Sequence, residues 1–208
     1  MRYVLALIVA LAAGGCAVGG KHQYHDITPE LKYPVRGKVA VAVQDQRKDV
    51  VSGTRPESYV GWSRGGYGNP FDVTTESGQP LAKEFQTSIA AALTRAGAQV
   101  VRVDVRPAAA PAEARKQLAA TGADKAVLLV LRDWHVDTYF NVNLDHDVSL
   151  TVLGRRGQVL ATKELTGSDR IGTGLVDPYA VARESVPPAY RRKLEQLLAD
   201  PAVVAALR

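Results

Sequence analysis

Hydrophobic patterning over residues 126–167 constrains the fold of this chain more than any other feature. Ala126–Leu131 is continuously apolar, which is typical of an interior strand covered on both faces. From Arg132 the apolar residues alternate with polar ones, which predicts that the strand extends beyond its cover. Asn141–Leu153 alternates cleanly, and Val159–Gly167 returns as a further strand after the turn residues 154–157. The pattern therefore predicts a late antiparallel meander.

The segments before the meander alternate between strands and helices. Strands are predicted over 38–43, where valines occupy every second position, and over 99–105. Helices are predicted over 81–96, from apolar residues at helical spacing, over 112–120, and over 188–207. We therefore expect an α/β fold, a two-layer sandwich with helices on one face of a mixed sheet, followed by the meander and a C-terminal helix.

Composition indicates a folded domain with a modest positive charge. The chain has 208 residues, of which 46% are hydrophobic and 23% are charged, and this argues against a disordered stalk. The length supports a single domain, predicted over 37–208. The net charge of +5 is small and dispersed, so we do not expect nucleic acid as a partner. With one cysteine the chain forms no internal disulfide, and its stability must come from packing.

The N-terminus has the order of a secretory signal. Arg2 supplies a positive charge, Val4–Ala13 is apolar, and Gly14 and Gly15 are small residues directly before Cys16. The apolar run is shorter than the roughly 20 residues that cross a bilayer. This arrangement resembles the lipobox of bacterial lipoproteins, in which the cysteine is acylated before cleavage and becomes the new N-terminus. The alternative is an ordinary signal peptide, which would leave a free thiol in an oxidising compartment.

The lipobox resemblance implies a location for the protein. It makes residues 1–15 a signal peptide and Cys16 the site of lipid attachment, with palmitate among the acyl groups expected. Residues 16–36 are then a polar, flexible tether. Ala17 follows the cysteine where an aspartate would signal retention in the inner membrane. By Gram-negative sorting rules, this implies an outer-membrane protein that faces the periplasm and has the membrane as a partner through its anchor.

A second likeness covers most of the chain. The first strand closes in residues 39–47, VAVAVQDQR, and it is followed by the helix over 81–96 and the late meander with its C-terminal helix. Together with the cysteine, these features resemble the YajG-type uncharacterised lipoproteins of Gram-negative outer membranes over residues 38–208. The resemblance implies an envelope location and an α/β fold. It implies no activity, because the family carries no established one.

Residues 50–79 are predicted to form a long loop rich in Gly, Ser and Thr, and such loops are often functional. Aromatic side chains supply large contact area at low entropic cost. The residues predicted to contact a partner are Tyr59, Trp62, Arg64, Tyr67 and Phe71. Arg55 and Arg64 would suit a carboxylated cell-wall polymer or an acidic envelope protein. The alternative is that the aromatic residues cover an otherwise exposed sheet edge.

A second candidate cluster combines aspartates and histidines of two neighbouring segments. Its members are Asp133, His135, Asp137, Asp145, His146 and Asp147. If a hairpin turns near Phe140, the carboxylates face one another, which destabilises the pair unless a cation intervenes. Histidine and carboxylate side chains are ligands that zinc and calcium accept, but His146 falls on the apolar face and the spacing matches no established metal pattern. We therefore predict no metal site, and we expect His146 to be a core or subunit-contact histidine.

The sequence contains no catalytic motif that points to an enzyme. A Gly-x-Ser-x-Gly elbow, a phosphate-binding loop and His-Glu-x-x-His are all absent, and no cofactor is expected. The predicted function is non-enzymatic binding or scaffolding in the cell envelope, with the oligomeric state open. Two alternatives remain. One is a cell-wall or lipid hydrolase that uses Asp133, His135 and Asp137, and the other is a structural subunit of an oligomeric envelope complex.

Overall fold

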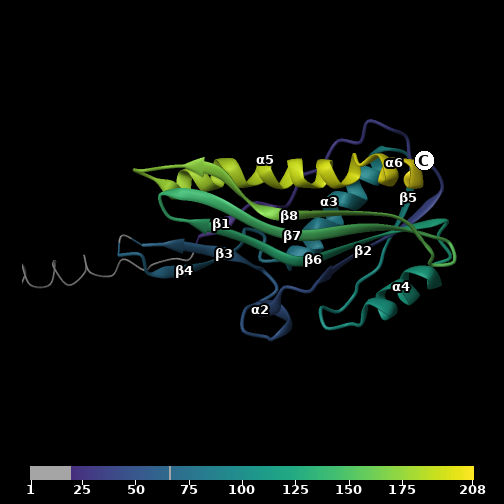
Figure 1. Ribbon diagram of the computed structural model, residues 1–208, viewed down its shortest axis with the longest axis horizontal. Coiled ribbons are helices and arrows are strands. Elements are labelled where there is room, and N and C mark those ends of the chain that lie inside the picture. The colour runs from purple at the N-terminus through teal and green to yellow at the C-terminus, as the bar shows by residue number, and fades with distance from the viewer. Residues whose placement is uncertain (1–19, 66) are drawn as a thin grey trace, which may run out of the picture.

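One mixed sheet organises the computed structural model, which describes residues 20–65 and 67–208. Within these residues eight strands form the sheet, in the order β1-β4-β3-β6-β2-β5, with β7 and β8 continuing from β6. The strands are β1 (Lys21–His22), β2 (Lys38–Asp45), β3 (Tyr59–Arg64), β4 (Pro70–Thr75), β5 (Gln99–Arg102), β6 (Lys125–Thr138), β7 (Asn141–Gly154) and β8 (Val159–Thr173). The helices are α2 (Lys48–Val51), α3 (Leu81–Arg95), α4 (Pro111–Ala120), α5 (Pro178–Leu198) and α6 (Pro201–Leu207). The predicted α/β class is confirmed (Figure 1).

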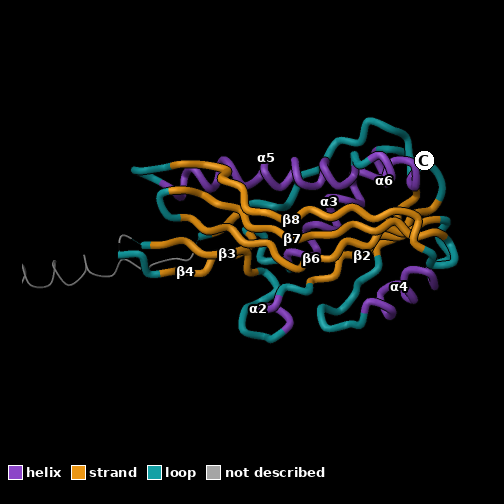
Figure 2. Tube along the Cα trace, in the orientation of Figure 1, coloured by secondary structure: helices purple, strands orange, loops and turns teal. Residues whose placement is uncertain are grey.

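Strand β6 pairs along both of its edges. One edge runs antiparallel to β7 from Lys125 to Thr138, and β7 in turn pairs with β8, so the predicted meander is confirmed (Figure 2). The other edge pairs in parallel first with β2, over 125–131, and then with β3, over 136–138. Two different strands therefore share one edge of β6 and leave a gap between them.

A β-bulge between Leu131 and Asp133 changes which side chains of β6 face the main core. Before the bulge the core residues are odd-numbered, as Val127 and Leu129 are, and after it they are even-numbered, as Trp134 and Val136 are. A bulge inserts one extra residue into one strand of a pair, which accounts for the change of parity. It lies where β2 ends, so the strand extends beyond its partner there, as the alternation from Arg132 predicted.

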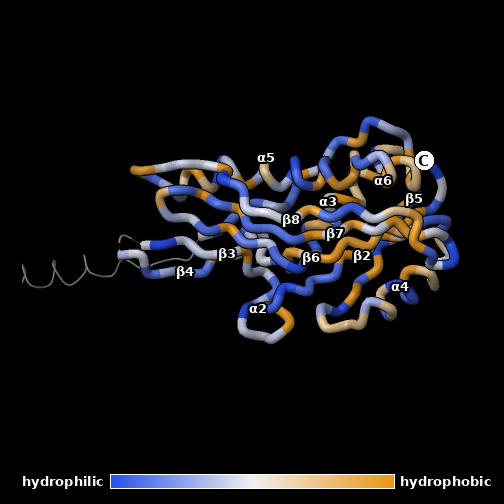
Figure 3. Tube along the Cα trace, viewed as in Figure 1, coloured by the Kyte–Doolittle hydropathy of each residue, from blue (hydrophilic) through white to orange (hydrophobic). Residues whose placement is uncertain are grey.

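Helices cover the two faces of the sheet unequally. The inner face is packed against α3, α5 and α6, which bury the main apolar core. Helix α4 lies on the opposite, outer face, where its Ala114 and Leu118 pack against Ala40 and Ala42 of β2 (Figures 1 and 3). The expectation that all helices share one face is therefore wrong for α4. Strand β2 directs valines inward and small alanines outward, and the alanines leave room for a helix on that side.

Residues 50–79 do not form the long structureless loop that their composition predicted. They contain α2 and the antiparallel β3–β4 hairpin, which pairs with β6 on one side and with β1 on the other. Val60 and Val73 are fully buried in the main core. A register shift between Tyr59 and Gly61 interrupts the alternation of apolar residues, and the segment therefore lacks the regular pattern by which a strand is recognised.

Residues 20–36 are packed on the domain, so the expectation of a flexible tether is wrong for this part. Tyr24 is fully buried, and Trp134 donates a hydrogen bond of 3.1 Å to its hydroxyl. The Tyr33 hydroxyl donates to the Leu198 carbonyl at 2.8 Å. Large aromatic side chains anchor a polar segment because each buries much apolar area and still satisfies its hydroxyl. The predicted signal peptide and Cys16 lie outside the described residues.

Burial of His22 is expected to make the stability of the protein depend on pH. Its side chain is 2% exposed, and burial lowers its pKa from 6.5 to about 4. The unfolded chain therefore binds the proton at a higher pH than the folded protein does. The free energy of unfolding is at its full value above pH 6.5 and falls by about 3 kcal/mol as the pH decreases towards 4. Urea unfolding over this pH range measures the decrease.

The matched control for this prediction is His22→Leu, which has similar volume and does not titrate. This variant should lose less stability between pH 7 and pH 4 than the natural protein does. Burial also lowers the pKa values of His135 and His146, so part of the pH dependence remains in the variant. Equal pH profiles for the two proteins would show that His22 contributes nothing.

Candidate functional site

A groove of about 850 Å³ lies on the outer face of the sheet. Its base is formed by β6 and β7 after the bulge and by the neighbouring part of β8, and one side is formed by the segment that joins β2 to α2. The polar side chains along it come from residues far apart in the sequence. They are Arg47, Asp49, Tyr59, Arg132, Asp133, His135, Asp145 and Asp147, and we call this site the outer-face groove.

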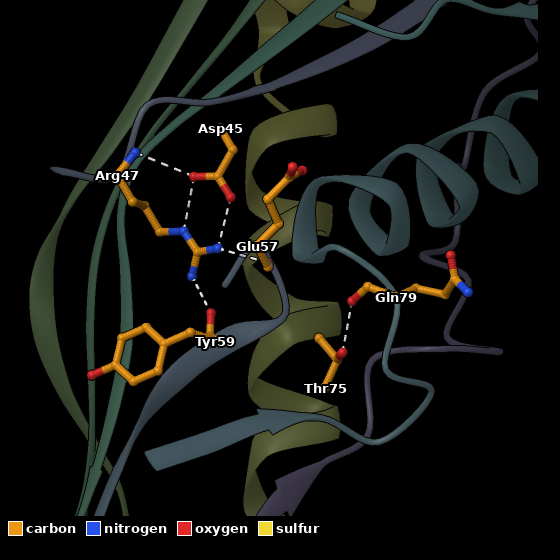
Figure 4. A network of polar contacts seen from close by, with 6 residues as sticks. All are labelled: Asp45, Arg47, Glu57, Tyr59, Thr75 and Gln79. Carbon is orange, nitrogen blue, oxygen red and sulfur yellow. Dashed lines mark hydrogen bonds and ion pairs between the residues drawn. The ribbon is translucent and has the colours of Figure 1, made fainter. Parts of the chain in front are cut away.

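A buried ion pair fixes the side of the groove that leads from β2. The Arg47 guanidinium donates to both Asp45 carboxylate oxygens, at 2.9 Å and 2.6 Å. It also donates to the backbone carbonyl oxygens of Glu57 and Tyr59 (Figure 4). The side chains of Asp45 and Arg47 are 1% and 6% exposed. The Asp-Gln-Arg string at the end of the first strand therefore fastens β2 to the start of β3.

The aromatic residues of β3 and the Asp/His segment of β6 meet on this face. The His135 ring lies edge-on to Trp62, with ring centroids 4.0 Å apart, and it is 5.9 Å from the Tyr59 ring. Arg64 of β3 forms an ion pair of 2.8 Å with Asp137 of β6. The sequence predicted two separate candidate sites, and the parallel pairing of β3 with β6 makes them one.

The remaining predicted contact residues lie elsewhere. Tyr67 is fully exposed in the turn between β3 and β4, and Phe71 is half-buried on β4. His146 is 4% exposed and lies on the inner face, as its place in the alternation predicted. The groove residues that sequence reasoning missed are Arg47, Asp49 and Arg132. All three are charged residues that follow an apolar run, and residues at such positions are usually solvated.

Arginines neutralise part of the acidic charge on the outer face. Arg132 bridges Asp147 and Glu164, which relieves the repulsion between carboxylates on facing strands. Hydrogen bonding to Arg132 holds the pKa of Asp147 below its usual range. Arg55 is paired with Asp72, and Arg64 with Asp137. The expectation that Arg55 and Arg64 recognise an acidic partner therefore loses its basis, since each already has a carboxylate.

Three carboxylates of the groove, those of Asp49, Asp133 and Asp145, have no ion-pair partner among the described residues. Across the β6–β7 pair, Asp133 lies opposite Asp147 and Asp145 lies opposite His135. Partial burial raises the pKa of Asp133. The groove thus presents acidic oxygen atoms that no ion pair among the described residues neutralises.

Neutral polar groups in the groove also lack partners. Burial lowers the pKa of His135 despite the nearby carboxylates, so its imidazole is uncharged at neutral pH. Burial raises the pKa of Tyr59 to about 12, and its side chain therefore keeps the phenolic proton. Among the described residues, neither the Tyr59 hydroxyl nor His135 Nε2 has a hydrogen-bond partner, although both atoms are buried. Such atoms are costly unless a ligand or water satisfies them.

The arrangement gives little support to hydrolytic chemistry. No ion pair in the described part of the chain joins His135 to a carboxylate, so an Asp–His dyad is not assembled. Asp137 is held by the Arg64 guanidinium, which keeps its pKa below the usual range against the effect of burial. The residues that the structure describes contain no group of three metal-ligating side chains placed to hold an ion.

Comparison with known proteins supports the fold and no particular function. No family model and no curated protein matches the chain. A protein of the family DUF330 from Xanthomonas campestris is similar in structure, with 14% identity and a TM-score of 0.54. The similarity covers 87% of this chain and 93% of that one. The fold is shared.

A hypothetical protein from Chlamydia trachomatis has 15% identity and a TM-score of 0.47 over 82% of this chain and 99% of its own, too low to carry an argument. Membership of the YajG-type family stays an expectation from the sequence. Among the described residues, no helix has the length and apolar character needed to span a bilayer.

Proposed function

We propose that the protein is a non-enzymatic binding module of the bacterial cell envelope. In this proposal acylated Cys16 anchors it in the outer membrane and its domain faces the periplasm. The signal-like N-terminus supports the anchor. Anchoring confines the domain to a surface and raises its local concentration, so that weak contacts with a partner suffice. The outer-face groove is the proposed contact site.

The observation that carries the proposal is the combination of unpaired acids and unpartnered polar groups in one groove. Asp133 and Asp145 supply carboxylates, and the Tyr59 hydroxyl, on a side chain that is 3% exposed, supplies a further acceptor. Trp62 and Tyr59 bring aromatic rings beside them. Carboxylates and aromatic faces together favour ammonium and guanidinium groups. The ligand is therefore a lysine- or arginine-bearing segment of an envelope protein.

Binding of a fluorescent lysine- and arginine-rich peptide tests this proposal. The natural protein should bind it in fluorescence anisotropy, and the affinity should fall as the salt concentration rises. The variant Asp133→Asn/Asp145→Asn should bind at least about a hundredfold more weakly, because it loses two charge-assisted hydrogen bonds that each contribute about 1.5 kcal/mol or more.

Glu184→Gln provides the matched control, because Glu184 is exposed on α5 at the other face of the sheet. It removes one negative charge and should leave the affinity unchanged. A glutamate-rich peptide of equal length should not bind. If the acidic peptide binds as well as the basic one, or if the double variant retains full affinity, the groove is not a site for basic segments.

A further inference from the structure

Exposed apolar side chains gather at one end of the molecule. Three turns meet there: the β3–β4 turn, the β6–β7 turn and the β8–α5 turn. The backbone N–H of Gly174 donates to the Phe140 carbonyl at 3.0 Å, which joins the second and third turns. Arg64, Gly68 and Phe140 line a common hollow of about 310 Å³ between the first two. Figure 1 shows these turns together at the left, and Figure 3 colours the end of the β8–α5 turn as hydrophobic.

Four of the seven large apolar side chains that are exposed among the described residues lie at this end. They are Tyr67 (103% exposed), Phe140 (51%), Leu175 (78%) and Val176 (98%), and we call them the apolar tip. Each belongs to a turn, where polar residues are usual. A cluster of exposed apolar residues on a soluble domain marks a surface that contacts a protein or a membrane.

The N-terminal segment leaves the domain close to the same end. Gly20 lies against Tyr179, the second residue of α5, and against Val73 of β4. Val73 is three residues from Pro70, the end of β4 nearest the tip, which is a distance of about 10 Å along the strand. Cys16 is four positions before Gly20, and even a fully extended chain of that length spans at most about 14 Å.

These two distances bring the apolar tip close to the membrane. If acyl chains hold Cys16 at the lipid surface, the packed segment 20–36 allows no long tether, and the two distances together keep this end of β4 within about 25 Å of that surface. The opposite end of β8, at Leu160, is about 40 Å farther along the strand. We propose that the apolar tip is the membrane-contacting end of the domain, with Phe140, Leu175 and Val176 seated in the interfacial region of the leaflet that holds the acyl chains.

This inference rests on the lipid anchor of the proposed function, and it orients the outer-face groove. Strand β6 runs from the far end towards the tip, so the groove lies along the side of the domain and stays open to the periplasm. Interfacial apolar side chains are buried about 5–10 Å into the boundary between headgroups and acyl chains. A rigid orientation of the groove follows from two points of attachment, the acyl chains and the tip.

Tryptophan quenching by brominated lipids tests the contact. The full-length acylated protein is reconstituted on vesicles of phosphatidylethanolamine and phosphatidylglycerol, part of which carry bromine near the headgroup. Phe140→Trp and Leu175→Trp should each show at least about a twofold quenching of the added fluorescence, relative to the natural protein with its buried Trp134 and groove-side Trp62. Leu160→Trp, at an apolar position that is 45% exposed near the opposite end of β8, should show none.

Flotation of the same samples separates the two proposals. If the natural protein floats with the vesicles but the added tryptophans of Phe140→Trp and Leu175→Trp are not quenched, the tip contact is overturned and the anchor is left intact. Equal quenching at 140, 175 and 160 also overturns it. If the unquenched tryptophans shift to the blue as protein concentration rises, the tip binds a second copy and not lipid. Protein that floats no better than Cys16→Ser overturns the anchor, and the tip contact with it.

Discussion

Replacing Arg47 with alanine is expected to lower the free energy of unfolding by about 3–5 kcal/mol, because the change leaves a buried carboxylate without its partner. Asp45 is 1% exposed, and the Arg47 side chain and backbone supply the hydrogen bonds that its oxygens receive. The same guanidinium donates to the carbonyl oxygens of Glu57 and Tyr59, and both bonds would be lost, although the Glu57 carbonyl keeps a second donor in the Leu81 N–H. Urea unfolding of the two proteins at neutral pH measures the difference.

Arg132→Ala is the control, because it removes an arginine whose ion pair is more accessible to solvent than that of Arg47. Its ion pair with Asp147 has side chains that are 37% and 31% exposed, and such pairs contribute about 1 kcal/mol or less. A double variant, Asp45→Leu/Arg47→Met, removes both charges and should be less destabilised than Arg47→Ala, since no buried charge is left alone. A loss of about 1 kcal/mol or less for Arg47→Ala would mean that the buried pair does not hold β2 to β3.

Substitution of Gly61 by alanine should destabilise the protein by more than about 3 kcal/mol and should also abolish binding at the groove. Gly61 has φ +140°, and a Cβ at this position would lie 2.1 Å from the Val136 carbonyl oxygen. The obstacle is the backbone of β6, which cannot move aside as a flexible side chain can. Strand β3 would therefore separate from β6 and remove Tyr59 and Trp62 from His135.

Gly157→Ala distinguishes the effect of backbone strain from that of the steric overlap between a Cβ at position 61 and the Val136 carbonyl. Gly157 lies in the β7–β8 turn with φ +80°, and a Cβ there would meet nothing within 4 Å. The substitution should cost only the strain of a left-handed alanine, about 1–2 kcal/mol, and should leave peptide binding unchanged. Thermal unfolding and the anisotropy assay give both readouts. If Gly61→Ala is no more harmful than Gly157→Ala, close contact between β3 and β6 is not needed.

Periodic patterning accounts for the parts of the fold that could be predicted. The meander was predictable because apolar and polar residues alternate without interruption over Asn141–Leu153. In the structure this strand pairs on both of its edges. Helix α3 was predictable because its buried residues recur at helical spacing. The end of apolar cover near Arg132 also followed from the sequence, since the pattern changes there from continuous to alternating.

Other parts depend on tertiary contacts that no local pattern encodes. The C-terminal helix was predicted to begin at Pro188, because the apolar residues that follow it recur on one side of a helix. It begins at Pro178, where the Asp177 carboxylate caps it by accepting from the Ala180 N–H at 2.9 Å, and it continues through Pro187 and Pro188. Packing of Ala182 and Val186 in the main core offsets the missing backbone donors.

Most residues of the candidate site could be predicted from the sequence, but not that they form one site. Tyr59, Trp62 and the aspartates were identified as two separate groups, since about 70 residues separate them in the sequence. Their meeting depends on β3 pairing with the last residues of β6, beyond the end of β2. The ion pairs of Arg55 and Arg64 likewise depend on which residues share a face, and this can only be seen once the strands are paired.

The bulge in β6 has a consequence for how this chain can tolerate changes of length. Strand faces exchange whenever one residue is lost from a regular strand. The bulge already holds one residue in excess at Arg132. A deletion at that point would restore simple alternation and keep Trp134 inside and His135 outside. Deletion of Val136 instead, in the regular part of the strand, would turn the Asp137 carboxylate inward and the buried Thr138 side chain outward. Loss of a residue from this strand is therefore tolerated at the bulge and not in the regular part that follows it.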